Sequence, residues 1–517
     1  MRTSFAPFCL ITLFAAAVIA QPSNSATFGH RIDAMGSIQS VIDGEGNAID
    51  LYDISGGANP AASHFNEAYA VPLEWQHWTG GVDKYAMDFS FKTIEYPGPI
   101  GSDNEKRSWY WIDGVSRILV DKGFENGFSM RINFNGGYQT LRKSWQDGYA
   151  PLPNEIRHNY AAATLDWDEI SRRAVTTGAA SITPIGEFYG SFHTKFGLSL
   201  GAGGGYGFSE FEDMYFASGW KTSMKGYVAA HRISLGARYT YPDLSDYFAV
   251  GFNYGISGGS VNNEKDDDYE AYVGDDNSLG FQAEFGYPKF VRGAVGFGSK
   301  TMNEDYFSSA TDTIADSFED KLSSVDFKLK LTGEGLKVPV NVGIDMSNWS
   351  TSGENTASEI EIDGSSVAFG ISTVPVAEML TFAAQYELGE NNYESVTAGS
   401  SASMESNRIS FGTEIYPVRE FGVRLGFEIF ERVPDSDYES LFGGYVLPYI
   451  GPLGRLDFVP EIEKGNALTG GLALRLDEGR LLIEISGKHY FTSDPQIYKD
   501  NSANSDEAFF GLTYYLK

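Results

Sequence analysis

Residues 380–389, LTFAAQYELG, alternate apolar and polar side chains. Successive side chains of a β-strand point to opposite faces, so Phe382, Tyr386 and Leu388 would share one face, with Gln385 and Glu387 on the other. A half-buried strand of a water-soluble protein has the same pattern, so one segment decides nothing. Eleven such segments follow one another from about residue 246 to the end of the chain. This succession is typical of a transmembrane β-barrel.

Short turns and longer connections alternate between these segments. The turns are predicted near Pro242-Asp243, Tyr287-Pro288-Lys289, Thr332-Gly333-Glu334-Gly335, Pro375-Val376, Pro417-Val418-Arg419 and Asp477-Glu478-Gly479, where Pro, Gly and Asp fix turn geometry. Between them lie acidic or Ser/Asn-rich stretches at 262–277, 303–320, 350–363, 391–405 and 434–466. Bacterial barrels carry short turns on the periplasmic rim and long loops on the outer rim.

The expected fold is therefore all-β, a transmembrane antiparallel up-and-down β-barrel. Fourteen strands can be placed from His193 onward. Before it, residues 71–78, 86–95, 127–137 and 158–167 are strand-like, and residues 107–120 could form a strand or a short helix. The sequence predicts 14 to 20 strands, with 16 to 18 favoured.

The first twenty residues predict a secretory signal peptide. Arg2 precedes an apolar stretch that is too short to span a membrane as a helix, and small residues lead up to Ala20. The only cysteine, Cys9, lies within it, so the mature protein would contain no thiol. The formal net charge of −31 argues against a nucleic-acid partner, which needs a basic surface. The predicted location is the bacterial outer membrane, with its lipid as a partner.

The polar face of the strands predicts an interior lined by charges of both signs. These charges have two interpretations: they pair across neighbouring strands and stiffen the wall, or they line a polar channel and set its selectivity. The predicted lumen-lining residues are Glu284, Asp326, Lys328, Lys330, Asp345, Glu387, Arg408, Glu414, Arg424, Glu428, Glu484 and Lys488.

No sequence pattern indicates catalysis, a cofactor or a metal centre, and we expect none of the three. The seven histidines are scattered, without the helical pair spacing of a zinc or di-iron site. The acidic run at 266–276 lacks the glycine and glutamate of a calcium-binding EF-hand loop, where the chain has Ala271 and Asn277. It is better interpreted as a solvated acidic loop. Such loops could still meet divalent cations at the outer surface.

The segment before the first strand carries three short motifs: Asp33-Ala34-Met35-Gly36-Ser37, then the 43–48 element DGEGNA, then the 56–62 element GGANPAA. This order resembles the fatty-acid-transporter superfamily of outer-membrane barrels, which includes long-chain fatty-acid and aromatic-hydrocarbon channels and the barrel shuttle of type IX secretion. The resemblance implies that residues 21–65 form a plug inside the barrel, with Asn59, Pro60 and Ala61 as its matching motif. Residues 66–517 would form the barrel. The chain is longer than typical members between Pro97 and Phe192.

The resulting functional prediction is a barrel channel for passive uptake of small hydrophobic compounds. The alternative is a barrel that transports nothing and acts as a structural, interaction or secretion-associated protein. A barrel enzyme would need a clustered Ser, His and Asp set, which the sequence spacing does not provide.

Overall fold

The computed structural model describes residues 30–42, 59–62, 83–99, 106–145, 154–160, 165–168, 173–176, 186–217, 220–241, 247–265, 268–287, 290–308, 313–333, 338–355, 359–376, 379–397, 399–434, 464–492 and 504–516. The predicted signal peptide, Cys9 and the strand-like stretch at 71–78 lie outside these residues.

Nearly all described residues belong to β-strands. The elements are α2 (His30–Ala34), η1 (Pro60–Ala62), β1 (Lys84–Pro99), β2 (Lys106–Gly123), β3 (Phe128–Trp145), β4 (Asn154–Tyr160), β5 (Leu165–Asp168), β6 (Arg173–Thr176), β7 (Gly186–His193), β8 (Leu198–Ala217), β9 (Trp220–Thr240), β10 (Tyr247–Lys265), β11 (Asp268–Tyr287), β12 (Val291–Ser308), β13 (Thr313–Thr332), β14 (Val340–Asn355), β15 (Glu359–Val376), β16 (Leu380–Ser395), β17 (Ser400–Val418), β18 (Phe421–Pro434), β19 (Lys464–Leu476), η4 (Asp477–Gly479), β20 (Leu481–Thr492) and β21 (Asn504–Tyr515).

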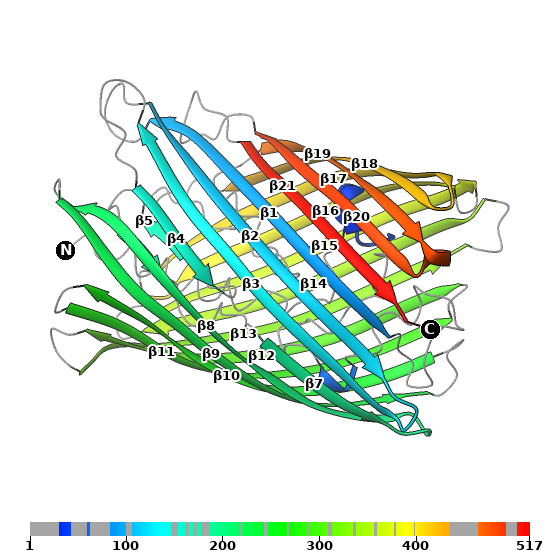
Figure 1. The fold of residues 1–517 in the computed structure, drawn as a ribbon, viewed down its shortest axis with the longest axis horizontal. Coiled ribbons are helices and arrows are strands. Elements are labelled where there is room, and N and C mark those ends of the chain that lie inside the picture. The colour runs from blue at the N-terminus through cyan, green and yellow to red at the C-terminus, as the bar shows by residue number, and fades with distance from the viewer. Residues whose placement is uncertain are drawn as a thin grey trace.

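The strands form one closed antiparallel barrel (Figure 1). Apart from β4 to β7, each strand pairs with its neighbours in sequence, and β21 closes the ring against β1, from Lys84 opposite Tyr515 to Glu95 opposite Asn504. Closure leaves no unpaired sheet edge, as a membrane-spanning sheet requires. The barrel has 18 strands around its circumference, which confirms the predicted fold class and the favoured strand count.

One of the 18 positions is shared by two strand segments. β7 pairs with the first part of β3 and β4 with the last part, from Tyr160 opposite Gly137. On the other side both segments pair with β8. The chain leaves the wall after Tyr160 and returns at Gly186, and β5 and β6 pair with each other in between as a separate two-stranded sheet. The predicted single strand at 158–167 is therefore wrong, because its residues belong partly to β4 and partly to β5.

Tight turns occupy one rim of the barrel. The turn between β19 and β20 is η4, where Asp477, Glu478 and Gly479 all have φ between 54° and 89°. β1 begins and β21 ends at this rim, because Lys84 pairs with Tyr515. A barrel whose two ends meet at one rim has an even number of strands, in agreement with 18 positions.

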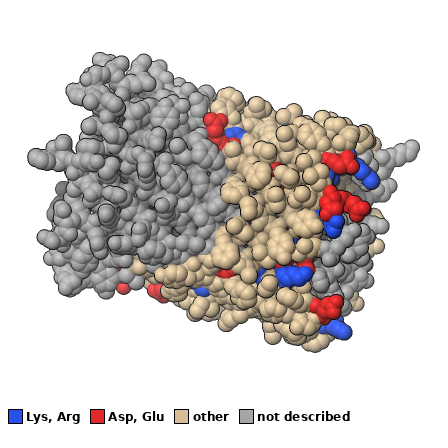
Figure 2. Space-filling model, in the orientation of Figure 1, with Lys and Arg blue, Asp and Glu red and all other residues tan. Residues whose placement is uncertain are grey.

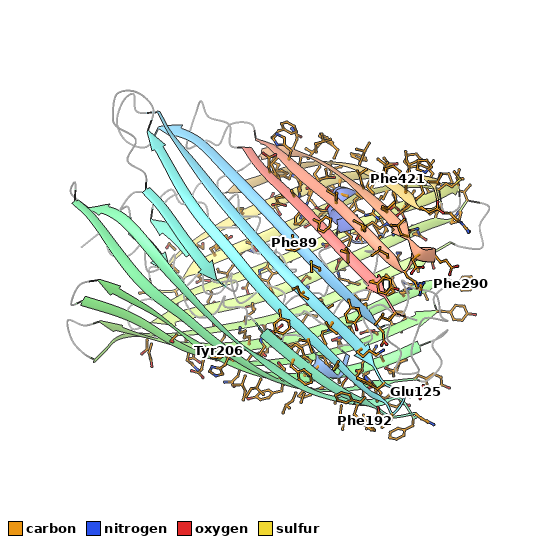
Figure 3. All side chains as sticks on the ribbon, viewed as in Figure 1. Phe89, Glu125, Phe192, Tyr206, Phe290 and Phe421 are labelled. Atoms are coloured by element: carbon orange, nitrogen blue, oxygen red, sulfur yellow. The ribbon has the colours of Figure 1, made fainter. Side chains whose placement is uncertain are left out.

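The outer face of the barrel is apolar over the half next to the short turns. Phe252, Phe411 and Leu468 are 47%, 50% and 53% exposed, and Phe89 and Phe421 also lie on this outer face (Figure 3). In Figure 2, charged side chains gather at the rim of short turns, and mainly uncharged side chains cover the band beside it. Such a band is typical of a lipid-facing barrel surface in the outer membrane.

No helix among the described residues is long and apolar enough to cross a membrane.

Several stretches predicted as loops are strands. β10 and β11 are separated only by residues 266–267, so most of the predicted acidic loop belongs to one long hairpin. The same holds at 303–320, 350–363 and 391–405, whereas the connection between β18 and β19 is long, as predicted. The prediction is wrong here because polar residues on both faces are typical of a loop, whereas a strand above the lipid band also carries polar residues on its outer face, which is in water. Residues 107–120 lie in a strand, not a helix.

Candidate functional site

The interior face of β13 to β18 carries opposite charges in direct cross-strand register. Lys328 lies 3.1 Å from Asp345, and Arg408 lies 3.2 Å from Glu387. The Nε of Arg424 donates to Glu414 at 2.8 Å. A buried ion is costly unless it is paired and hydrogen-bonded, so these pairs make a charged interior wall tolerable.

The other predicted lumen-lining residues also lie on the inner face. Glu284 lies 3.5 Å from Arg238, Asp326 accepts from the hydroxyl of Ser347, and Glu428 lies 3.0 Å from Lys488. Glu484 accepts from Arg424 at 2.5 Å. Lys330 is buried on β13, opposite Arg292. The twelve residues therefore lie on the inner face of strands between β11 and β20, and most of them are engaged by a neighbour in the wall.

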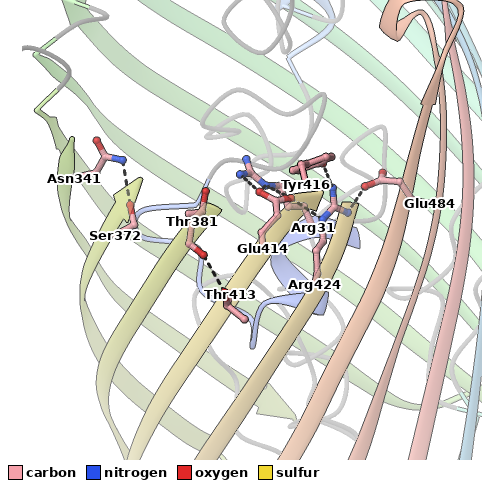
Figure 4. A network of polar contacts seen from close by, with 9 residues as sticks. All are labelled: Arg31, Asn341, Ser372, Thr381, Thr413, Glu414, Tyr416, Arg424 and Glu484. Carbon is pink, nitrogen blue, oxygen red and sulfur yellow. Dashed lines mark hydrogen bonds and ion pairs between the residues drawn. The ribbon is translucent and has the colours of Figure 1, made fainter. Parts of the chain in front are cut away.

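Residues 30–42 lie against this inner wall. Arg31, in α2, donates from Nη2 to Glu414 at 2.5 Å (Figure 4). Glu414 is thus shared by Arg31 of the N-terminal segment and Arg424 of the wall, and Arg424 also binds Glu484 and the hydroxyl of Tyr416. The sequence did not indicate Arg31 or Tyr416 as part of the site.

Neutral contacts continue along the same segment. The hydroxyl of Thr469 donates to the carbonyl of Ala34 at 3.0 Å, and the side-chain oxygen of Gln385 accepts from the backbone and hydroxyl of Ser40 at 3.0 and 2.7 Å. Met35 and Ile38 are fully buried in a small apolar cluster that also contains Ala383 of the wall. The segment is therefore packed, charged and hydrogen-bonded against β15 to β20.

A left-handed turn ends α2 and directs the chain along the wall. Gly36 has φ +83°, and the N–H of Ser37 donates to the carbonyl of Ile32 at 2.9 Å, as in a Schellman motif. A side chain at Gly36 would be strained by this φ and would also lie 3.0 Å from the carbonyl oxygen of Phe411.

The predicted motif Asn59-Pro60-Ala61 lies on a different arc of the inner wall. Asn59 is 2% exposed, its Oδ1 accepts from the N–H of Ala61 at 3.0 Å, and its Nδ2 donates to the carbonyl of Ala237 at 3.3 Å. The motif begins η1, which contacts β7, β8, β9 and β10. The N-terminal segment thus touches two separate parts of the wall.

Paired glycines of neighbouring strands make room for the N-terminal segment at three places. A Cβ on Gly412 would lie 2.3 Å from the carbonyl oxygen of Met35, and a Cβ on its register partner Gly426 would lie 2.3 Å from the N of Gly36. The pair Gly343 and Gly370 faces Ser40 and Val41, and the pair Gly201 and Gly236 faces Asn59 to Ala61. We call these three pairs the glycine seats. Glycine at interior positions of two adjacent strands is the sequence signal that could have revealed them.

A Ser/His cluster lies near the rim of short turns, although no such set was expected. The Nε2 of His193 is 2.8 Å from the hydroxyl of Ser129, and its Nδ1 is 2.7 Å from the hydroxyl of Ser199. A hydrolytic triad would place a carboxylate at Nδ1, where this cluster has a hydroxyl. All three side chains are at most 3% exposed. We therefore interpret the cluster as structural hydrogen bonding between strands of the wall.

The described acidic residues form no recognisable ion site. Within the described ranges, no group of three or more His, Cys, Asp and Glu side chains is arranged to hold a metal ion. The prediction of divalent cations at the acidic stretches therefore gains no support from these residues.

Comparison with solved structures finds other barrels at low similarity. A deltaS2 mutant of the TodX monoaromatic hydrocarbon channel matches with TM-score 0.39 and 10% identity, covering 95% of this chain and 99% of that one. The toluene transporter TbuX of Ralstonia pickettii matches with TM-score 0.30 and 12% identity, over 96% and 100%. The alcaligin receptor FauA of Bordetella pertussis matches with TM-score 0.40 and 10% identity, over 84% and 76%.

No protein-family profile matches the chain, and no curated protein matches it. Hydrocarbon channels, which the sequence resemblance named, are among the structural neighbours. At these scores the neighbours carry no argument about substrate or family. The barrel fold is established by the strand pairing of this chain, and a proposal for its function depends on the residues inside the barrel.

Proposed function

We propose that this protein is an outer-membrane channel for passive uptake of small, hydrophobic compounds, closed by its N-terminal segment. The observation that carries the proposal is the contact of residues 30–42 and 59–62 with two arcs of the interior wall. A barrel that served only as a scaffold would not need an interior built to receive its own chain. Passage would follow the concentration gradient, and the plug would limit leakage of ions.

The pairing of charges within the wall supports the idea that the plug can move away from the wall. Glu414 keeps its contact with Arg424 when Arg31 is withdrawn, and Glu428 keeps its contact with Lys488 when Ser37 is withdrawn. Movement of residues 30–42 therefore leaves these buried carboxylates paired, which avoids the large cost of an uncompensated buried charge. We also propose that the signal peptide is removed, that outer-membrane lipid surrounds the barrel and that the protein is not an enzyme.

Planar-bilayer recording tests the proposal. We expect the purified full-length protein to be nearly closed and a variant lacking residues 27–65 to conduct steadily. Negligible conductance of both proteins would refute the channel. It would leave the alternative of a structural, interaction or secretion-associated barrel, which pull-down from detergent extracts would then examine.

Uptake into liposomes tests the solute class. Loading of toluene into protein-containing vesicles, compared with glucose, should rise in the deletion variant for both solutes. Relative to protein-free vesicles, which give the rate at which toluene crosses lipid alone, the full-length protein should accelerate the loading of toluene and not that of glucose. Selectivity for glucose in the full-length protein would contradict passage of hydrophobic compounds.

A further inference from the structure

The amide side chain of Asn391 is buried and has no hydrogen-bond partner among the described residues. Asn391 is 0% exposed, whereas its neighbours Glu390 and Asn392 are exposed, so its side chain faces the barrel interior. Neither Oδ1 nor Nδ2 forms a hydrogen bond. Proteins rarely leave both halves of a buried amide unpaired, because the desolvation penalty is not compensated.

The residues in register with Asn391 form an aromatic and apolar surface. Gly364 lies directly opposite on β15 and Met404 directly opposite on β17, and Trp349 is the next residue in the same row. A Cβ on Gly364 would lie 2.1 Å from Cε2 of Trp349, so the glycine lets the indole lie across β15 towards Asn391. Tyr393 is the next inward residue of β16 and is 1% exposed.

This surface lies on the outer side of the plug contacts. Asn391 is six residues beyond Gln385, which holds Ser40, so it is about 20 Å further along the strand at ~3.3 Å per residue. Leu388 is the last exposed apolar residue of β16 before Glu390, so the surface also lies beyond the lipid band. It therefore lies between the described plug contacts and the loop rim.

Among the described side chains of β16 and β17, no inward charge lies directly beside the amide. Along β16 and β17 the nearest inward charges are Glu387 and Arg408, which are paired with each other at 3.2 Å. The inward positions between that pair and Asn391 are Gly389 and Ser406. A hydrogen-bonding group bound here would therefore meet the donor and the acceptor of the amide, with no counter-ion from the described side chains of these two strands beside it.

We propose that Trp349, Gly364, Asn391, Tyr393 and Met404 form a binding station for neutral aromatic compounds that carry one group able to donate and accept a hydrogen bond, such as a phenol. The ring would lie against the indole and the thioether, and the hydroxyl would satisfy both atoms of the Asn391 amide. This inference rests on the proposed uptake function. It narrows the substrate class of that function, because a pure hydrocarbon would leave the amide without a hydrogen-bond partner.

Equilibrium binding of 4-methylphenol and toluene to protein in lipid nanodiscs tests the station, with empty nanodiscs as the reference for partitioning. The two probes differ by one hydroxyl. The wild-type protein should prefer 4-methylphenol by about tenfold, and Asn391→Leu should reverse the preference towards toluene. The matched control is Asn392→Leu, which alters the adjacent exposed residue and should keep the wild-type preference.

Folding of the variants is checked by heat-dependent gel mobility. Asn391→Leu should melt no lower than wild type, since it removes an unpaired buried amide, and Asn391→Ala provides a second variant that lacks the amide. An equal probe preference in wild type and both variants, or no binding above empty nanodiscs, would overturn the station. Failure of the channel proposal is a separate result, because it would show as absent conductance with the probe preference intact.

Discussion

Alanine at the Gly412–Gly426 seat should force the plug off the wall. An added Cβ would lie 2.3 Å from the carbonyl oxygen of Met35 at one site and 2.3 Å from the N of Gly36 at the other, whereas ordinary contact begins at 3.4 Å. About 1 Å must therefore be recovered from backbone on both sides. Overpacking of this kind costs about 1–3 kcal/mol, which shifts the equilibrium between seated and unseated plug by roughly 5- to 150-fold per site.

A single introduced thiol reports the position of the plug. Ser410, between these glycines and Gln385 on the inner wall, is fully buried, so Ser410→Cys in a Cys9→Ser background should react slowly with a water-soluble maleimide. Gly412→Ala and Gly426→Ala should each accelerate the reaction by the factor above and raise bilayer conductance. Their combination should be less than additive, because a Cβ at either position would meet Met35.

Gly470→Ala is the matched control. A Cβ there would meet nothing closer than 3.5 Å, so it should change neither labelling nor conductance. Unchanged labelling and conductance in both seat variants, with the barrel folded, would refute the idea that the paired glycines hold the plug.

Three further perturbations follow from the contacts. Arg31→Ala should weaken plug seating by about 1 kcal/mol, since Arg31 is 21% exposed and partly screened, and bilayer recording should show more frequent openings; Arg480→Ala, which breaks an exposed pair with Asp477, should not. Glu414→Ala should lower the free energy of unfolding by about 1–3 kcal/mol in urea titrations of the liposome-embedded protein, because the buried Arg424 loses one charged partner and keeps Glu484; an unchanged free energy of unfolding would contradict this view of the network. Phe411→Arg on the lipid-facing band should lower the free energy of unfolding by about 2–4 kcal/mol in the same titration. Glu405→Arg, on the exposed face of the same strand nearer the loop rim, should lower it little. Equal effects of the two substitutions would contradict the position assigned to the lipid-facing band.

The wall was predictable from sequence because alternation is a local property. Phe382 and Gln385 reveal their faces through their immediate neighbours, and fourteen strands from β8 to β21 follow from that rule alone. The charges on the polar face were found in the same way. Their partners were harder to assign, since register between strands, as for Glu414 opposite Arg424, depends on the whole barrel.

The contacts between the N-terminal segment and the wall were largely beyond sequence reasoning. The contact between Arg31 and Glu414 joins residues 383 positions apart, and no local pattern relates them. The role of Gly412 and Gly426 depends on what lies against them and not on their own strands. The Ser/His cluster was missed for the same reason, because Ser129 and His193 meet only through the pairing of β3 with β7.

The shared position of β4 and β7 shows how this barrel could tolerate an insertion. Tyr160 lies opposite Gly137 and Gly186 opposite Phe134, so two residues of β3 separate the two pairings. Asn159 opposite Glu210 and Gly186 opposite Tyr206 leave three residues of β8 between the two pairings, one more than on β3 because the last pair with β8 involves Asn159 and not Tyr160. The two segments are thus in-register halves of one strand. The hairpin of β5 and β6 comes between these halves in the sequence without altering the circumference of the barrel. Foreign sequence exchanged between β4 and β7 should therefore leave the register of the other seventeen positions unchanged.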